Sequence, residues 1–424
     1  MARSRTWLWW HSWIGVTTGL MLFVICWSGT VAVFSHEIDW LLDPALRVEP
    51  VSPATPSWDD VVAAAQRAVP GQTLERLVLP VGPRDAAQLW AHDEHGTVTR
   101  IYVDPASARV QGTTSHFNVQ RFFRSFHMNL FFNTGPWGYL VVCSLALPLL
   151  ASLVTALVFY RRWWQRWLVL KLDRGWRVFW SDLHKTGGLW SLWFVLVIAL
   201  TAAWYFIEAA GIVPDYPEPP RLNAAPAPLR LDDALSRVRS HWPQLQVRSI
   251  TLPGSYDGNV LVLEGQAGNM LVRDRANKLF VDPATGAELA RQRAVDLSLA
   301  ARWVDTADPL HFGDFAGLGV KVIWFAFGLL LSGLSLTGAY LHVQRLRRKN
   351  AGVDRRPAVV AAYGVSAVLL AASAVGGWAE VRRYGPLVDG VRHWPVVPLP
   401  VSVFIATWVV ATLAILWIWV RRLR

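Results

Sequence analysis

Long apolar runs alternate with polar segments along this 424-residue chain, and six of the runs are long enough to cross a lipid bilayer. They cover about residues 9–34, 139–160, 189–207, 315–343, 359–378 and 401–420. A helix rises about 1.5 Å per residue, so about 20 apolar residues span a hydrocarbon core of about 30 Å. The pattern therefore predicts an α-helical integral membrane protein with six transmembrane helices.

The two longest polar segments, residues 37–130 and 211–310, show the same order of features. Each begins with a helix-like stretch that is led by two aspartates and stops near a proline. Strand-like runs with alternating apolar residues follow, and each segment then reaches an Asp-Pro turn. These features are Asp59-Asp60 and Asp232-Asp233, Pro70 and Pro243, and Asp104-Pro105 and Asp282-Pro283. We therefore expect two α/β domains in a duplicated 2+2 core of parallel repeats.

The same pattern divides the whole chain, and the last two apolar runs fall outside the duplicated core. We expect transmembrane helices at 1–36, 131–160, 184–210, 311–343, 359–378 and 401–424, the last with a cytoplasmic tail. The remaining predicted segments are α/β domains at 37–130 and 211–310, basic cytoplasmic loops at 161–183 and 344–358, and a periplasmic loop at 379–400.

Charge predicts the orientation of the chain. The 41 basic residues exceed the 30 acidic ones, which gives a formal net charge of +11. Much of the excess flanks apolar runs, at 161–177, 345–356 and 421–424, so it indicates membrane orientation and not nucleic-acid binding. Basic segments stay on the cytoplasmic side, which predicts a bacterial inner-membrane protein with both termini cytoplasmic and both α/β domains periplasmic.

Two histidines at the start of apolar runs each have a glycine four residues on. They are His11 with Gly15 and His184 with Gly188. Residues i and i+4 share one helix face, so the missing side chain leaves room beside the ring for a flat ligand such as a porphyrin. Histidines at the ends of membrane spans are functional candidates by default, although an interfacial histidine can also simply reach the membrane surface.

A second set, His127 and His311, precedes the second and fourth apolar runs at the opposite membrane level. Haem iron can be held by two imidazoles, and one haem cannot bridge ligands about 30 Å apart. Depth therefore pairs His11 with His184 at an inner haem and His127 with His311 at an outer haem. The chain has no CxxCH motif, so both would be non-covalent haem b.

Other residues compete for these roles or support them. His36 is an alternative outer ligand, and His342 an alternative inner one. Haem propionates attract bases, which makes Arg124, Lys185 and Lys321 candidates for cofactor binding; contact with lipid headgroups is the competing interpretation.

Taken together, the motifs resemble the PepSY-associated transmembrane-helix family, the iron-regulated membrane proteins that include ferric-siderophore reductases. The resemblance covers about residues 5–345, and the motifs that carry it are His11-x-Trp13-x-Gly15, Ser35-His36-Glu37-Ile38-Asp39-Trp40, Phe126-His127-x-Asn129-Leu130-Phe131, Asp182-Leu183-His184-Lys185 and Pro309-Leu310-His311-x-Gly313-Asp314-Phe315. It implies PepSY-like outer domains, haem b between the helices, and electron transfer to iron complexes outside.

The favoured hypothesis is a di-haem b inner-membrane reductase that passes electrons from a quinol or a cytoplasmic donor to an Fe(III)-siderophore in the periplasm. No GxGxxG or P-loop motif indicates a nucleotide site of its own. The alternatives are a non-redox permease for siderophore or metal, which parallel repeats also suit, and a PepSY-type sensor or regulator. The matched histidines favour the reductase.

Overall fold

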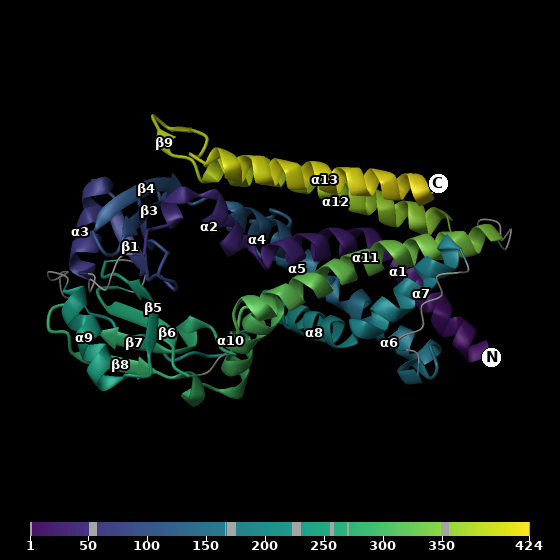
Figure 1. Ribbon diagram of the computed structural model, residues 1–424, viewed down its shortest axis with the longest axis horizontal. Coiled ribbons are helices and arrows are strands. Elements are labelled where there is room, and N and C mark those ends of the chain that lie inside the picture. The colour runs from purple at the N-terminus through teal and green to yellow at the C-terminus, as the bar shows by residue number, and fades with distance from the viewer. Residues whose placement is uncertain are drawn as a thin grey trace.

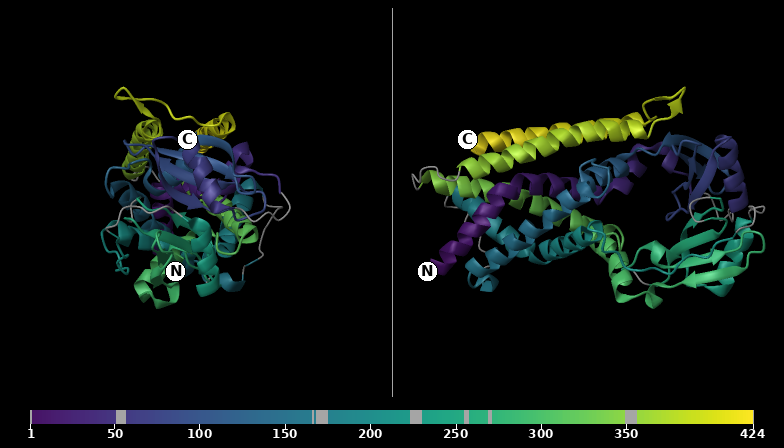
Figure 2. Two further views of the ribbon diagram at one scale, coloured as in Figure 1. Left: turned by 90° about the vertical axis from the view of Figure 1, so that its left-hand side faces the viewer. Right: turned by 180° about the vertical axis from the view of Figure 1, so that it is seen from behind.

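A helical bundle and a β-sheet domain stand end to end in the computed structural model, and both chain termini lie at the bundle end away from the sheet (Figures 1 and 2). The structure describes residues 2–50, 57–165, 167, 175–222, 230–254, 258–268, 271–348 and 356–423. The predicted basic loops fall partly outside these ranges, at 166, 168–174 and 349–355.

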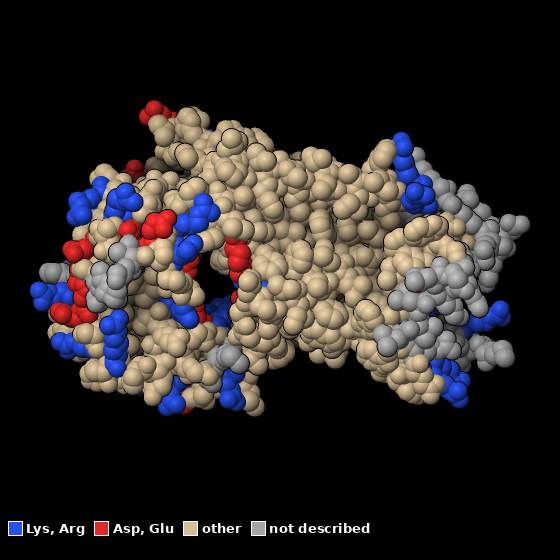
Figure 3. Space-filling view, in the orientation of Figure 1, with Lys and Arg blue, Asp and Glu red and all other residues tan. Residues whose placement is uncertain are grey.

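Within the described ranges, six helical segments are long and apolar enough to cross a membrane. They are α1 (Ala2–Ala32), α5 with α6 (Trp137–Ser144 and Ala146–Phe159), α8 (Leu192–Ala209), α11 (Leu318–Arg348), α12 (Arg356–Arg383) and α13 (Leu399–Leu423). On the face shown in Figure 3, a broad middle band carries no charged residues, whereas both ends do. The prediction of a multi-pass helical membrane protein is confirmed.

Small residues let α1 and α11 pack closely along the bundle. A Cβ atom on Gly19 would lie 3.1 Å from the Ser335 carbonyl oxygen, and one on Gly328 would lie 2.5 Å from Thr30 Oγ1. In lipid the hydrophobic effect does not drive helices together, so close contact between small residues supplies the attraction. Helices α1 and α11 therefore run side by side through the interior of the bundle.

Shorter helices lead into the spans or cover the sheet. They are α2 (Ser35–Leu42), α3 (Trp58–Ala68), α4 (Val119–Asn129), α7 (Trp176–Trp190), α9 (Leu231–His241) and α10 (Leu299–Phe312). Single 3₁₀ turns lie at η1 (Pro44–Leu46), η2 (Trp163–Gln165), η3 (Asp274–Ala276) and η4 (Ala294–Asp296). Three of the four singled-out histidines lie on these short helices, because α4, α7 and α10 end before the spans α5, α8 and α11 begin.

The two α/β segments share one antiparallel sheet of eight strands, in the order β4-β3-β2-β1-β5-β6-β7-β8. The strands are β1 (Thr73–Val78), β2 (Ala87–His92), β3 (Val98–Asp104), β4 (Arg109–Ser115), β5 (Gln246–Thr251), β6 (Leu261–Gln266), β7 (Lys278–Val281) and β8 (Glu288–Gln292). Each segment contributes a helix and a four-stranded meander, as its repeated features predict. The separation into two domains needs correction, because β1 pairs with β5 and makes the sheet continuous.

The paired aspartates explain part of this joining. The Asp232 carboxylate accepts the backbone N–H of Trp58 at 2.9 Å, and the Asp59 carboxylate accepts that of Leu231 at 2.8 Å. Each aspartate therefore caps the helix of the other segment, whereas the sequence indicated only a favourable charge at its own helix N-terminus. This reciprocal exchange holds α3 and α9 together on one face of the sheet.

The Asp-Pro turns close equivalent hairpins in the two segments. Asp104 Oδ1 accepts the N–H of Ala106 at 3.0 Å, and Asp282 Oδ1 accepts the N–H of Ala284 at 2.8 Å. An aspartate that bonds the backbone two residues on makes a local turn, so the two motifs perform the same task.

Candidate functional site

The four histidines form two pairs inside the bundle. The ring centres of His127 and His311 lie 6.1 Å apart, near the sheet domain; we call these residues the sheet-side pair. The ring centres of His11 and His184 lie 6.4 Å apart, toward the other end; we call these the far-end pair. The structure thus brings together the partners that membrane depth predicted.

One histidine of each pair donates to a backbone carbonyl. His11 Nδ1 lies 3.0 Å from the Ser152 oxygen, and His127 Nδ1 lies 2.9 Å from the Ile25 oxygen. A carbonyl oxygen can only accept, so each Nδ1 carries the hydrogen. The Nε2 atom of each neutral ring therefore keeps its lone pair.

The second histidine of each pair donates to a threonine hydroxyl. His184 Nδ1 lies 2.9 Å from Thr337 Oγ1, and His311 Nδ1 lies 2.8 Å from Thr201 Oγ1. Each hydroxyl already donates its one hydrogen to its own helix, to the Gly333 and Val197 carbonyls respectively, both at 2.8 Å. Each threonine must therefore accept from the ring, which again leaves Nε2 with its lone pair.

The ring spacing suits a metal between each pair. Metal–nitrogen bonds of about 2 Å place two Nε2 atoms about 4 Å apart and their ring centres about 6 Å apart. Within the described ranges, no three His, Cys, Asp or Glu side chains form a group that could hold a metal ion. Each pair can thus supply two axial ligands to a metal whose other ligands come from a cofactor, as in haem.

A cavity of about 430 Å³ adjoins the sheet-side pair, and both histidines line it. Apolar side chains of α1, α5, α6, α8 and α11 form most of its wall, and Gly29 and Gly328 also line it. Its polar part includes three arginines, Arg124, Arg273 and Arg275, and two acids, Glu208 and Asp308. An apolar slot with cations at one end fits a porphyrin with two carboxylates.

The sheet domain supplies two of these arginines and is fixed by them to the helix that carries His311. Arg275 Nε donates to Asp305 at 2.7 Å, and Arg273 pairs with Asp308, both aspartates lying on α10. Burial and the charge of Arg275 lower the pKa of Arg273 to about 10, so the guanidinium stays charged at neutral pH. The sheet domain and the bundle therefore share one charged surface at the cavity.

The role predicted for the +4 glycines, room for a flat ligand beside each ring, stays a prediction. A Cβ atom on Gly15 or Gly188 would meet no atom within 4 Å, so neither glycine touches a histidine ring. The glycines that do lie on neighbouring helices: a Cβ on Gly29 would come 2.5 Å from His127 Cε1, and one on Gly338 would come 3.2 Å from His184 Cε1. Contacts between helices therefore also shape the space beside each ring, and a within-helix spacing cannot reveal them.

Two of the predicted basic residues have acidic partners. Lys185 Nζ bonds Asp182 at 3.0 Å on its own helix, and Lys321 Nζ bonds Glu37 at 2.6 Å. Arg124 lines the cavity together with His127, which lies three residues later on the same helix. At the far-end pair, Arg345 Nη1 donates to Ser12 Oγ at 3.2 Å, which places a cation next to His11.

The two ring pairs given above do not include the alternative ligands. His36 Nε2 lies 3.1 Å from the Gln120 amide nitrogen, and burial with the charge of Lys321 lowers the His36 pKa to about 4. His342 is buried on α11, one turn before Arg345.

Two sets of residues at the site were not predicted from the sequence. One is the threonines that bind the histidine rings, and the other is the arginines that the sheet domain contributes to the cavity. Thr201 and Thr337 are hydroxyl residues inside apolar spans, a signal that could have identified them. Arg273 and Arg275 lie far from any apolar run, so only the fold reveals their position at the cavity.

A family comparison agrees with the architecture of this multi-pass membrane protein. The model of the PepSY-associated TM region matches residues 8–345. The chain belongs to this family, as its motifs indicated. A comparison with curated proteins finds no match.

Proposed function

We propose that this protein is a di-haem b reductase of a bacterial inner membrane. It would pass electrons from the cytoplasmic side to an Fe(III)-siderophore in the periplasm and release Fe(II). The observation that carries the proposal is that Nδ1 of all four histidines lies within hydrogen-bond distance of a carbonyl or threonine oxygen, which leaves Nε2 available at a ring spacing suited to a bis-histidine metal.

When bound, haem supplies one-electron chemistry at iron, with a potential set by its ligands and surroundings. His127 and His311 would hold one haem, and His11 and His184 the other. The hydrogen bonds at Nδ1 fix each ring orientation and increase its basicity. Arg124 and Arg273 would hold propionates at the sheet side, and Arg345 would do so at the far end.

The two histidine pairs would lie at different depths in the membrane. His127 bonds the carbonyl of Ile25, which lies fourteen residues after His11 on α1. At about 1.5 Å per residue, the pairs stand about 21 Å apart along the bundle, within a hydrocarbon core of about 30 Å. This spacing supports two stations on one electron path across the bilayer.

The histidine contacts follow one pattern in the two halves, which supports the predicted duplication. His11 bonds α6 and His127 bonds α1 in the first half; His184 bonds α11 and His311 bonds α8 in the second. The basic flanks and the shared position of both termini support a cytoplasmic far end and a periplasmic sheet domain (Figure 1).

Reduction would release iron because Fe(II) carries less charge and attracts hard oxygen ligands more weakly than Fe(III) does. The donor would be a quinol or a separate cytoplasmic reductase. Carboxylate, hydroxamate or catecholate siderophores all present such oxygen ligands, so the proposal commits to this ligand chemistry and not to one molecule.

The test is iron reduction by the full chain in liposomes that contain a trapped, membrane-impermeant reductant. An Fe(III)-siderophore and an impermeant Fe(II) chelator are added outside. We expect coloured Fe(II) chelate with wild type and with His241→Ala, an exposed histidine that bonds only its own helix and Ser240. We expect no chelate above that of empty liposomes with His184→Ala or His311→Ala. Equal rates in all four proteins would overturn the proposal.

A further inference from the structure

Helices α12 and α13 lie beyond residue 345, where the family match ends. They run along one side of the bundle, and their connection, with the short strands β9 (Leu387–Val388) and β10 (Val391–Arg392), reaches the sheet domain (Figures 1 and 2). We propose that this hairpin is a brace that fixes helix α4 and thereby positions His127. The role given to His127 rests on the reductase function proposed above.

The strongest contact of the brace is aromatic. The Trp408 ring on α13 packs edge-on against three rings of α4, with centre distances of 6.0 Å to Phe122, 4.9 Å to Phe123 and 5.7 Å to Phe126. Edge-to-face contacts at these distances stabilise both position and orientation. Trp408 therefore holds the middle turn of α4.

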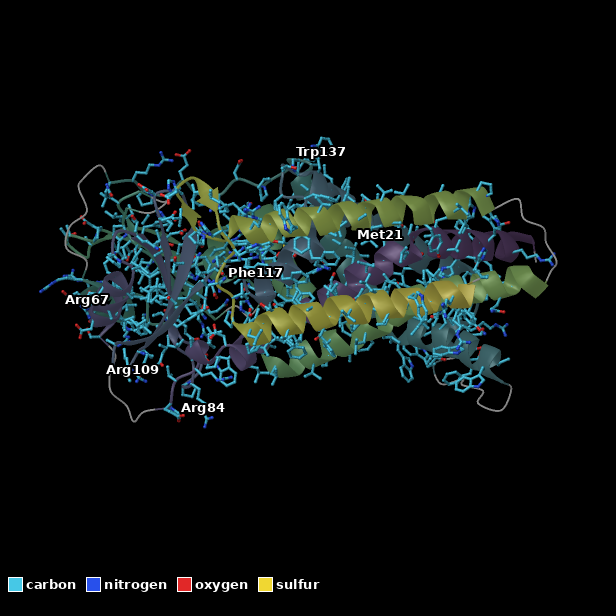
Figure 4. All side chains as sticks on the ribbon, turned by 90° about the horizontal axis from the view of Figure 1, so that it is seen from above. Met21, Arg67, Arg84, Arg109, Phe117 and Trp137 are labelled. Atoms are coloured by element: carbon cyan, nitrogen blue, oxygen red, sulfur yellow. The ribbon has the colours of Figure 1, made fainter. Side chains whose placement is uncertain are left out.

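A buried carboxylate adds a polar tie. Glu380 on α12 accepts the hydroxyl hydrogens of Ser125 on α4 at 3.3 Å and of Tyr384 at 2.7 Å. Only 5% of Glu380 is exposed, so these bonds replace water and would be costly to lose. The Tyr384 ring also contacts Phe117, which lies where the hairpin meets the sheet domain (Figure 4).

The brace also packs against the turn that follows His127. Leu130 and Phe131 both adopt the left-handed conformation, with φ of 52° and 61°, which is unfavourable for residues other than glycine. On α12, a Cβ on Gly376 would lie 3.1 Å from the Phe131 oxygen, and one on Gly377 would lie 2.9 Å from the Phe131 ring. The two glycines let α12 pack directly over this strained turn.

The connection between α12 and α13 contacts the end of the edge strand β4. Ser115 donates its backbone N–H to the Val396 oxygen at 3.3 Å, and Arg392 donates to Thr97 Oγ1 at 3.0 Å. An edge strand offers free backbone groups, and the Ser115 bond occupies one of them and links the brace to the sheet.

Helix α4 consequently has two occupied faces. Phe122, Phe123 and Phe126 contact the brace, whereas Arg124 and His127 face the cavity. A shift of α4 toward the space left by a missing brace contact would move His127 away from His311 and from the Ile25 carbonyl. The brace is therefore a positioning element, and Trp408 and Gly376 are its most testable residues.

The experiment uses the full chain with two variants and two matched controls. Gly376→Val would push α12 away from Phe131, whereas Gly364→Val lies on the same helix with no atom within 4 Å of its new Cβ. Trp408→Ala removes the ring on α4, whereas Trp417→Ala removes a ring on α13 that is 56% exposed. Trp408→Phe keeps a smaller ring and should give an intermediate effect. It takes the place of Trp408→Ala if that variant fails to fold.

Hydrogen–deuterium exchange of residues 119–131 is measured first, because it does not depend on haem. Exchange should rise about tenfold in Gly376→Val and Trp408→Ala and stay at the wild-type rate in both controls. In protein with haem, transfer of the sheet-side haem to apomyoglobin should also be about tenfold faster, with the far-end haem unchanged.

Unchanged exchange in α4 in both folded variants would overturn the brace, as would equal disturbance of both haems. A wild type that lacks haem would defeat the reductase proposal but not the brace, which the exchange measurement still decides. The two failures are thus distinguishable.

Discussion

At the scale of single residues, hydrogen bonds decide which nitrogen of each central histidine is free. The hydroxyl groups of Thr337 and Thr201 each donate their one hydrogen to a carbonyl of their own helix, so each accepts a hydrogen bond from the ring. The hydroxyls inside these apolar spans thus act as fixed acceptors. A valine in their place would fill the same volume and leave the ring free to turn.

We predict that Thr337→Val weakens haem binding at the far-end pair by about 10- to 100-fold, the usual cost of losing a ligand's hydrogen-bond partner. Thr337→Ser should restore binding because it keeps the acceptor. Thr18→Val is the matched control, since the Thr18 hydroxyl bonds only the Ile14 carbonyl of its own helix. Haem titration of the haem-free protein measures all four, and full affinity in Thr337→Val would contradict the prediction.

A second residue, His116, should make the sheet domain sensitive to acid. Arg100 Nε donates to His116 Nδ1 at 3.1 Å, and burial together with the Arg100 charge lowers the His116 pKa to about 2. The unfolded chain binds a proton near pH 6.5 while the folded one does not. The stability that depends on neutral His116 is therefore complete above pH 6.5 and falls as the pH decreases from there.

The test compares wild type with His116→Gln, whose amide oxygen can still accept from Arg100 but cannot titrate. As the pH falls from 6.5 to 4.5, the wild type should lose up to about 1.4 kcal/mol per pH unit relative to the variant. Chemical unfolding at several pH values gives the difference. Parallel pH profiles for the two proteins would rule this role out.

At this scale the sequence identified the four histidines and Arg124 as candidate site residues, because few titratable side chains stand at the ends of apolar runs. It did not predict Gly29, Gly338 or Arg273, whose roles depend on which helices are neighbours. Lys321 shows the same limit, since its partner Glu37 is remote in sequence.

At the scale of elements, reciprocal capping joins the two α/β segments. Asp59 and Asp232 each satisfy backbone N–H groups at the start of the other segment's helix. Free N–H groups at a helix N-terminus need such partners. The exchange, with the β1–β5 pairing, makes one structure from two segments that a span of membrane helices separates in sequence.

We predict that Asp59→Ala and Asp232→Ala each destabilise the sheet domain by about 1 kcal/mol, the usual cost of losing a helix cap. Their neighbour Asp60 is exposed, and Asp60→Ala should cost less because it loses only a charge near the helix end. Thermal unfolding of the three variants and of the double variant measures these costs. Equal losses in Asp59→Ala and Asp60→Ala would show that the carboxylate bond does not matter.

Element identity could largely be predicted from the sequence, whereas element pairing could not. Apolar length predicted the spans, and repeated Asp-Pro turns predicted matching hairpins. Continuity between β1 and β5 depends on long-range packing of two alternating strands, which have no local signal for their partner. The break before α11 does have a local signal, because Gly313 and Gly317 both adopt positive φ there.

At the scale of the whole molecule, apolar and charged regions are segregated along one axis. The uncharged middle band of Figure 3 lies between the sheet domain and the basic far end. Two histidine pairs stand at different levels of that band, and the sheet domain contributes Arg273 and Arg275 to the nearer one. Electron entry, crossing and delivery would therefore follow the long axis of the protein.

The most direct test of the central claim is haem stoichiometry, measured by pyridine haemochrome together with the reduced-minus-oxidised spectrum of the purified full chain. The account predicts two b haems per chain in wild type. It predicts one in His184→Ala and one in His311→Ala, with different residual spectra because each variant keeps a different pair. Haem-free protein from haem-replete cells, or loss of the same haem in both variants, would contradict it.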